Sequence, residues 1–342
     1  MSYLYLSTFP PIQIERLPEK KKEFIKRLAE VQLVTYVANK TFAVVQFPLS
    51  TYPTVETIHS STTKFQLVEI FRMTDALGSI DYALYLNEVV QWHSREEPFS
   101  HELMVLIPAM LCHSPPKRVL ILGGGDGLPA REALRIDSIE HVRVVELDDE
   151  LIEFTRSIPT LKEKCKDSFG KGVSNIGNVV AGDALNEVNK NSTDAGSWDL
   201  VIDDCDYFVT DQPSGVALAN YKNYLSSLES MLRPGGVGSI LLSVTHWNWS
   251  VLSALEGSPA LESQPPLDWN DVRNQVEQIC NKYFTHWKSY AFGGMMGIEL
   301  FVYFSNSPFQ QNDRPLIPNL FPSTHHALFT LVGESSSSSI PM

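Results

Sequence analysis

The 342-residue sequence predicts an α/β protein with a doubly wound, Rossmann-like and mostly parallel sheet, joined to a smaller N-terminal β-rich domain. From Lys117 onward, short apolar runs alternate with helix-like segments, which is the order expected of βαβ units. The first of these runs ends in a cluster of glycines, as nucleotide-binding folds of this class require. Before it, the stretch that starts at Lys64 alternates apolar and polar residues, as antiparallel strands do.

Shifts in this patterning divide the chain into four expected parts. Residues 1–62 form an N-terminal extension of mixed α/β structure, and residues 63–115 form a small antiparallel β domain with a linking helix. Residues 116–331 form the Rossmann-like domain. Residues 332–342 form a disordered tail, because the run ESSSSSIPM is low in complexity.

In the N-terminal parts, a charged segment predicts a helix from Pro18 to Val31, and a hairpin follows around residues 38–40. Asp75-Ala76-Leu77-Gly78 predicts a turn within the small sheet. A helix is expected over about 100–112, where Ser114-Pro115-Pro116 ends it.

In the large domain, the expected strands are apolar and rich in β-branched residues, and they read RVLILG, VRVVEL, VVAGD, WDLVIDD and VGSILLSV. The helix-like segments between them read PAREALR, DELIEFTRSI and ALANYKNYLSSLESML. Residues 257–268 (GSPALESQPPLD) predict a loop or linker. A helix from Trp269 to Tyr283 and a late strand, LFVYFS, complete the domain.

Composition narrows the classes of function. The net charge of −13 and the pI of about 5.1 disfavour a nucleic-acid partner, whereas a cationic substrate fits an acidic protein. The four cysteines are far apart and form no CxxC pair, so neither a zinc site nor a disulfide framework is expected. With no signal sequence and no apolar run of about 18 residues, we expect a soluble, cytoplasmic protein without a membrane partner or a metal.

The strongest motif is RVLILGGGDGLPARE, in which an apolar strand runs into a glycine turn. Gly123 and Gly125 let the backbone approach a ligand closely, and Asp126 within the turn is a residue that dinucleotide binding does not require. Glu146 ends the next strand about 20 residues later, where a carboxylate can accept from both ribose hydroxyls. Asp183 ends the third strand and can accept from an adenine amino group. Three strand ends therefore converge on one nucleoside; solvation of strand ends is the simpler alternative for the last two acids.

Together these pieces resemble the aminopropyltransferases, the family of spermidine and spermine synthase. The resemblance runs from about Lys64 to Ser305, and it rests on LYLNEVVQ, EEPFSHE, LILGGGDG, VVELD, AGDA and WDLVIDD. It implies a donor co-substrate, decarboxylated S-adenosylmethionine, and an amine or polyamine acceptor. The residues that it implies for the donor are Gln91, His101, Gly123, Gly125, Asp126, Glu146, Asp183 and Ala184.

The resemblance also implies a general base, because the attacking amine must be neutral. With a pKa near 10, only about one amine in a thousand is neutral at pH 7, which costs roughly 4 kcal/mol. Asp204 at the end of WDLVIDD matches the family's base, and Asp203 is the alternative if the strand is one residue shorter. Asp126, which would bind the donor's ammonium group, completes the expected catalytic pair.

On the acceptor side the sequence departs from the family. Ser100 replaces a tyrosine whose phenol contacts the reacting amine, and the residues after Asp204 differ from the usual DSSDP pattern. The acceptor-side acid is then Asp206 or is absent, and Tyr207 or Tyr221 would replace the lost phenol. Glu299 in GIELFVYF matches a glutamate that faces the polyamine in spermine synthase.

Three functions remain open from the sequence. The first is aminopropyl transfer, and the second is N-methyl or other alkyl transfer from intact S-adenosylmethionine on the same fold. The third is a catalytically idle, nucleoside-binding paralogue, which the retained Asp126 and Asp204 disfavour. Because family members are commonly dimers through the N-terminal region, we expect a homodimer formed through residues 1–115.

Overall fold

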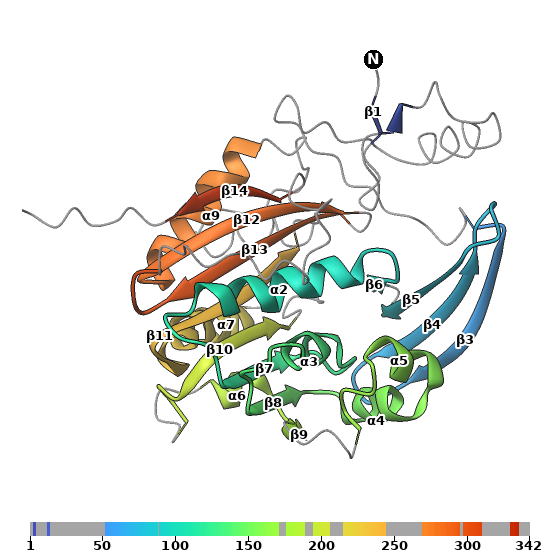
Figure 1. Cartoon of the computed structure of the whole chain (residues 1–342), viewed down its shortest axis with the longest axis horizontal. Coiled ribbons are helices and arrows are strands. Elements are labelled where there is room, and N and C mark those ends of the chain that lie inside the picture. Colours follow the sequence, from blue (N-terminus) through green and yellow to red (C-terminus); the bar gives the residue numbers. More distant parts are fainter. Residues whose placement is uncertain are drawn as a thin grey trace, which may run out of the picture.

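The computed structural model describes residues 3–4, 12–13, 52–87, 89–170, 176–188, 194–205, 215–243, 269–294, 297–309 and 329–334. In these ranges, the short strands β1 (Tyr3–Leu4) and β2 (Ile12–Gln13) pair with each other, and two larger sheets form the body of the protein (Figure 1). The expected helix over 18–31, the hairpin at 38–40 and the loop at 257–268 lie outside the described residues.

The smaller sheet is antiparallel, as predicted, and its strands follow one another in chain order. They are β3 (Thr54–Thr62), β4 (Leu67–Thr74), β5 (Ile80–Leu86) and β6 (Val89–His93). The predicted turn between β4 and β5 is present: the side chain of Asp75 accepts hydrogen bonds from the backbone N–H groups of Leu77 (2.8 Å) and Ser79 (2.9 Å). Gly78 has φ 83°, the left-handed region that favours glycine.

Strand β3 precedes the expected boundary at residue 62 and pairs with β4 along its whole length. Its side chains are mostly exposed, since it lies at the edge of the sheet. A strand that buries neither face lacks the apolar alternation from which strands are recognised. The residues TVETIHSST were therefore not predicted to form a strand. We propose that the small domain begins near residue 52.

The larger sheet has the order β14-β12-β13-β11-β10-β7-β8-β9. Its parallel strands are β7 (Arg118–Gly123), β8 (His141–Glu146), β9 (Ile176–Ala181), β10 (Trp198–Asp204) and β11 (Leu232–Ser243). Three antiparallel strands, β13 (Gly297–Ser305), β12 (His286–Gly294) and β14 (Phe329–Glu334), extend it beyond β11. The doubly wound prediction is confirmed, but β12 and β14 were not predicted, and β14 takes in residues 332–334 of the expected tail; residues 335–342 lie outside the described residues.

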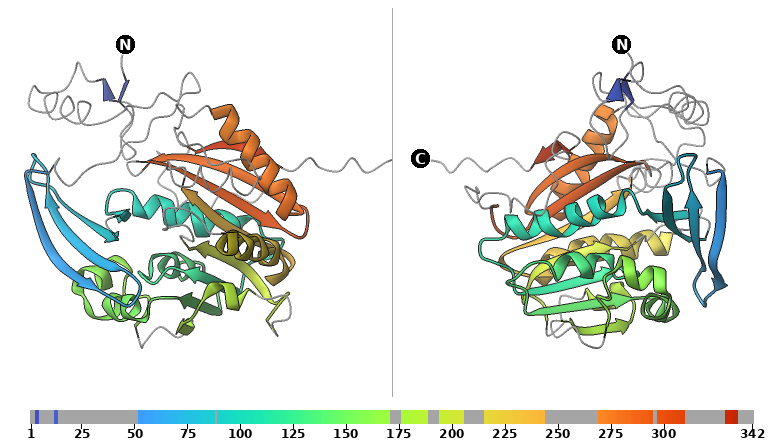
Figure 2. Two further views of the ribbon diagram at one scale, coloured as in Figure 1. Left: turned by 180° about the vertical axis from the view of Figure 1, so that it is seen from behind. Right: turned by 45° about the vertical axis from the view of Figure 1, so that its right-hand side comes forward.

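Helices cover both faces of the larger sheet (Figure 2). On β7, Val119 and Ile121 face a core built with α2 and α3, whereas Leu120 and Leu122 face a core built with α7 and α9. A strand buried on both faces is continuously apolar, which is why RVLILG was recognised. The helices are α2 (Glu97–Leu111), α3 (Leu128–Ala133), α4 (Asp149–Ser157), α5 (Pro159–Lys164), α6 (Ala184–Glu187), α7 (Gly215–Leu228), the 3₁₀ turn η3 (Glu229–Met231) and α9 (Trp269–Tyr283).

The two sheets are joined by an apolar cluster that is separate from both faces of the larger sheet. Val68, Ile70 and Leu84 of the small sheet pack with Leu151 of α4 and Leu161 of α5. This packing holds the small sheet beside the carboxyl ends of the parallel strands, where ligands of open α/β sheets bind. Among the described helices, none is long and apolar enough to cross a membrane.

Candidate active site

A cavity of about 310 Å³ lies at the carboxyl ends of the parallel strands, between the larger sheet and the small sheet. Strand order reverses there, because β8 and β10 lie on opposite sides of β7. Nine residues predicted for the site line this cavity: Gln91, His101, Gly123, Gly125, Asp126, Glu146, Asp183, Ala184 and Asp204. The structure therefore brings together residues that lie more than 100 positions apart in the sequence.

The glycine turn after β7 forms the floor of the cavity. Gly123 has φ 79°, and a Cβ atom there would collide with the backbone carbonyl of Asp204. A Cβ atom at Gly125 would lie 2.6 Å from Cγ of Glu146. The absence of side chains lets the turn fit between β8 and β10. This glycine turn also positions Asp126, whose Oδ1 accepts a hydrogen bond from the backbone N–H of Leu128 at 3.0 Å.

Glu146 and Asp183 are oriented by backbone hydrogen bonds. The Glu146 carboxylate accepts from the N–H groups of Gly125 (3.0 Å) and Asp148 (2.9 Å). Burial raises the pKa of Glu146, and these two bonds oppose the rise. Asp183 caps α6 by accepting from the N–H of Leu185 at 2.9 Å. Each carboxylate keeps lone pairs free to accept from a ligand's hydroxyl or amino groups.

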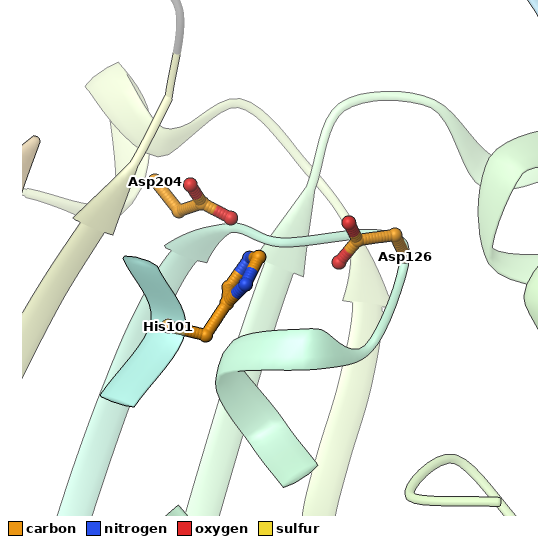
Figure 3. Close-up of side chains that lie close together, drawn as sticks. All are labelled: His101, Asp126 and Asp204. Atoms are coloured by element: carbon orange, nitrogen blue, oxygen red, sulfur yellow. The ribbon is translucent and has the colours of Figure 1, made fainter. Parts of the chain in front are cut away.

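His101, Asp126 and Asp204 form a compact charged cluster (Figure 3). The imidazole ring of His101 lies between the two carboxyl groups. One nitrogen or oxygen atom from each residue lies within 4.8 Å of the others, a spacing that suits a small cation such as an ammonium group or a metal ion. The three side chains come from α2, the glycine turn and β10, so the tertiary fold and not a local motif creates the cluster.

The cluster contains both signs of charge. Burial would lower the pKa of His101, but a hydrogen bond with Glu97 and the charges of Asp126, Asp204 and Glu97 raise it to about 9. His101 is therefore a cation at neutral pH. Burial raises the pKa of Asp204, and the nearby acids add to this rise, whereas His101 opposes it. Asp126 behaves in the same way: burial raises its pKa and the charge of His101 lowers it.

Asp203 and Asp204 point in different directions, as neighbours on a strand must. Asp204 lines the cavity. Asp203 is 3% exposed and accepts a hydrogen bond from the Tyr224 hydroxyl at 2.8 Å. Burial raises the pKa of Asp203 to about 7. Of the two acids that the sequence left open, Asp204 is the one that lines the cavity.

On the acceptor side, the structure describes Ser100 and Glu299, but Asp206, Tyr207 and the side chain of Tyr221 lie outside the described residues. Ser100 and Glu299 are buried and do not line the cavity. Burial raises the pKa of Glu299, while the Ser100 hydroxyl and the charge of His101 oppose the rise. Within the described part of the chain, the Ser100 hydroxyl and Oε2 of Glu299 have no partner at full hydrogen-bonding geometry.

The cavity also contains residues that the sequence did not indicate. Phe65 and Gln66, in the turn between β3 and β4, reach it from the small sheet, and Leu147 and Asp148 line it after β8. The Asp148 carboxylate accepts from the side-chain amide of Gln66 at 2.9 Å and also caps α4. An aspartate just before a helix is a known cap signal, so Asp148 could have been found, whereas Phe65 and Gln66 come from a turn with no recognisable motif.

Comparison with known proteins agrees with this geometry. A family model described as the spermine/spermidine synthase domain matches residues 97–254. A polyamine aminopropyltransferase of Pyrococcus abyssi is 32% identical over 182 residues, which cover 53% of this chain and 60% of that protein. A spermine synthase of Saccharomyces cerevisiae is 32% identical over 207 residues, which cover 57% and 61%. The chain thus matches less than two thirds of the length of these relatives.

Solved structures show the same fold. A spermidine synthase in complex with the transition-state analogue AdoDATO superposes with a TM-score of 0.59 at 21% identity, covering 80% of this chain and 85% of that chain. The spermidine synthase of Thermotoga maritima gives a TM-score of 0.57 at 22% identity, covering 80% and 84%.

Proposed function

The chain belongs to the spermine/spermidine synthase family, and from this premise we propose that it transfers an aminopropyl group from decarboxylated S-adenosylmethionine to an amine or polyamine, with release of methylthioadenosine. The observation that carries the proposal is a set of four carboxylates that line a cavity large enough for a nucleoside. Asp126 and Asp204 line the cavity together with Glu146 and Asp183. A cationic nucleoside fits such a lining.

The donor would bind through the strand ends. Glu146 would accept from the two ribose hydroxyls, and Asp183 and Ala184 would contact the adenine. Gln91 and His101 would contact the donor, and the glycines Gly123 and Gly125 would let the backbone approach it. Asp126 would bind its primary ammonium, since a half-buried carboxylate and an ammonium stabilise each other.

The transfer itself is a substitution at carbon. The lone pair of the acceptor nitrogen forms a bond to the aminopropyl carbon next to the sulfonium, and the electrons of the broken C–S bond stay on sulfur. The sulfonium becomes the neutral thioether of methylthioadenosine. The proton of the acceptor amine passes to Asp204, which lines the cavity beside Asp126 and acts as the general base.

Acceptor binding would use Ser100, Asp206, Tyr207 and Glu299. Ser100 and Glu299 lie close enough to each other and to His101 to affect the pKa of Glu299. A buried carboxylate with an unpaired oxygen favours a cationic partner, so Glu299 would hold an ammonium group of the acceptor. The acceptor is thus expected to carry at least two amines, one that reacts and one that is held.

Methyl transfer from intact S-adenosylmethionine is disfavoured by the same cluster. The additional carboxylate of that donor would lie beside Asp126 and Asp204, and like charges repel strongly in a cavity of low dielectric constant. We also propose a homodimer formed through residues 1–115, a cytoplasmic location and a reaction without a metal.

A turnover assay tests this function. The protein is incubated with decarboxylated S-adenosylmethionine and a set of diamines and triamines, and the products are identified by mass spectrometry. We expect methylthioadenosine and an amine lengthened by one aminopropyl group in equal amounts. An amine that gains a methyl group from intact S-adenosylmethionine would replace the proposal with methyl transfer, and binding without any turnover would support the idle paralogue.

A further inference from the structure

The orientation of His101 depends on Glu97, one helical turn earlier on α2. The Nδ1 atom of His101 lies 2.6 Å from the backbone carbonyl oxygen of Glu97 and 3.6 Å from its carboxylate Oε2. A carbonyl oxygen can only accept, so Nδ1 carries a hydrogen in every charge state of the ring. Nε2 is then the nitrogen left to interact with Asp126 and Asp204.

Glu97 is itself held from the next helix. The guanidinium of Arg131 on α3 donates to both carboxylate oxygens of Glu97, at 3.0 and 2.7 Å. Arg131 also donates to Glu132 at 2.7 Å and to the carbonyl of Lys164 at 2.9 Å. Glu97 is 2% exposed and Arg131 is 7% exposed. A two-pronged, buried contact of this kind fixes both position and angle.

This pair connects the two segments that form the cluster. His101 lies on α2 with Glu97, and Asp126 lies in the turn that leads into α3 with Arg131. The charges alternate along the path, from Arg131 through Glu97 and His101 to Asp126. Each buried charge therefore has an opposite neighbour, which offsets the cost of burial.

We propose that Glu97, held by Arg131, is a positioning residue that fixes the imidazole of His101 against Asp126 and Asp204. The inference rests on the proposed function, because that function gives the cluster its task of binding the donor's ammonium. Glu97 touches no substrate in this account and acts through His101.

A nearby ion pair provides a matched control. Glu102 also lies on α2, is 6% exposed and binds Arg135 of the segment after α3 at 2.6 Å. It therefore links the same two segments without contacting the cavity. If Glu97 merely stabilised this packing, Glu97→Gln and Glu102→Gln would have similar effects on donor binding.

The test is a double-mutant cycle between Glu97→Gln and His101→Ala, read as donor dissociation constant and kcat/KM. We expect Glu97→Gln to weaken donor binding about tenfold, because the buried carboxylate that pairs with His101 loses its charge. In the His101→Ala background the same substitution should have no further effect, because its partner is gone. Equal effects in both backgrounds, or an equal loss in Glu102→Gln, would overturn the proposal.

A second readout separates this inference from the proposed function. The ¹⁵N chemical shifts of the His101 ring report its protonation without donor or turnover. The backbone carbonyl that holds Nδ1–H remains in Glu97→Gln, so the expected change is a lower pKa of the ring, because the charge of Glu97 is lost. An unchanged His101 signal in that variant would contradict the positioning role even if the enzyme is active. If Glu97→Gln fails to fold, Arg131→Lys keeps the charge, removes the two-pronged contact and is expected to shift the pKa of His101 in the same direction.

Discussion

The residues proposed for the donor half and those proposed for the acceptor half of the site are held in different ways. Asp126, Glu146 and Asp183 follow the ends of three parallel strands, and backbone N–H groups orient each carboxylate. Ser100 and Glu299 come from α2 and from the antiparallel strand β13, and polar atoms of both lack partners within the described residues. The donor half is thus preorganised by the fold, whereas the acceptor half keeps bonding capacity that a substrate would satisfy.

The largest expected effect comes from Asp204, the proposed base. Asp204→Asn should lower kcat about 10³-fold, because an amide cannot take the proton of the attacking amine. Turnover assays at saturating donor and acceptor measure the loss, and a thermal melt checks that the fold is kept. Asp203→Asn is the matched control and should keep near-normal turnover, since Asp203 points away from the cavity. Full activity of Asp204→Asn would remove Asp204 from the mechanism.

Asp203, the acid next to Asp204, should affect the stability of the fold and not catalysis. Burial raises the pKa of Asp203 from 3.8 to about 7, so between these values the folded protein holds a proton that the unfolded chain releases. Its contribution to the free energy of unfolding therefore falls as the pH rises through this window, by about 4 kcal/mol. Asp203→Asn should remove this dependence. Urea unfolding of both proteins from about pH 4 to about pH 8 measures the difference, and parallel pH curves would contradict it.

The donor half can be weakened by itself at Asp126. Asp126→Asn should raise the dissociation constant of decarboxylated S-adenosylmethionine about 30-fold, since it removes one buried charge that pairs with the ammonium. The Michaelis constant for the acceptor should stay near its wild-type value. Calorimetry measures the dissociation constant of the donor, and initial rates give the Michaelis constant of the acceptor. An equal rise in both constants would mean that the halves are not separate.

A substitution at Glu299 should weaken acceptor binding and leave donor binding unchanged. Glu299→Gln should raise the acceptor's Michaelis constant about tenfold, because it removes one charge from the proposed amine contact. Donor affinity should change little, as Glu299 does not line the donor cavity. If donor affinity falls instead, Glu299 acts on the donor through His101, and it belongs with the donor-binding residues.

The sequence identified residues that line one cavity, and that we propose for the donor, because their signals are local. Each acid follows an apolar strand directly, and the glycine turn has a steric cause that the structure confirms at Gly123 and Gly125. The parallel strands and the helix Trp269–Tyr283 were found because their apolar patterns are strong. The edge strand β3 was not predicted, because it is exposed on both faces and has no apolar pattern.

The remaining features depend on tertiary contacts that no short pattern encodes. Gln66 reaches the cavity from the small sheet, and Glu97 meets Arg131 from another helix. The four-residue spacing of Glu97 and His101 was visible, and on a helix it predicts a contact. Its importance becomes apparent only when Asp126 and Asp204 are placed beside the ring.

The most direct test of the account is a calorimetric comparison of decarboxylated and intact S-adenosylmethionine with the wild-type protein. The two donors differ by one carboxylate, which would lie beside Asp126 and Asp204. We expect clearly tighter binding of the decarboxylated donor, and a loss of that preference in Asp126→Asn. Equal binding, or tighter binding of the intact donor, would contradict aminopropyl transfer and assign the cavity to a methyltransferase.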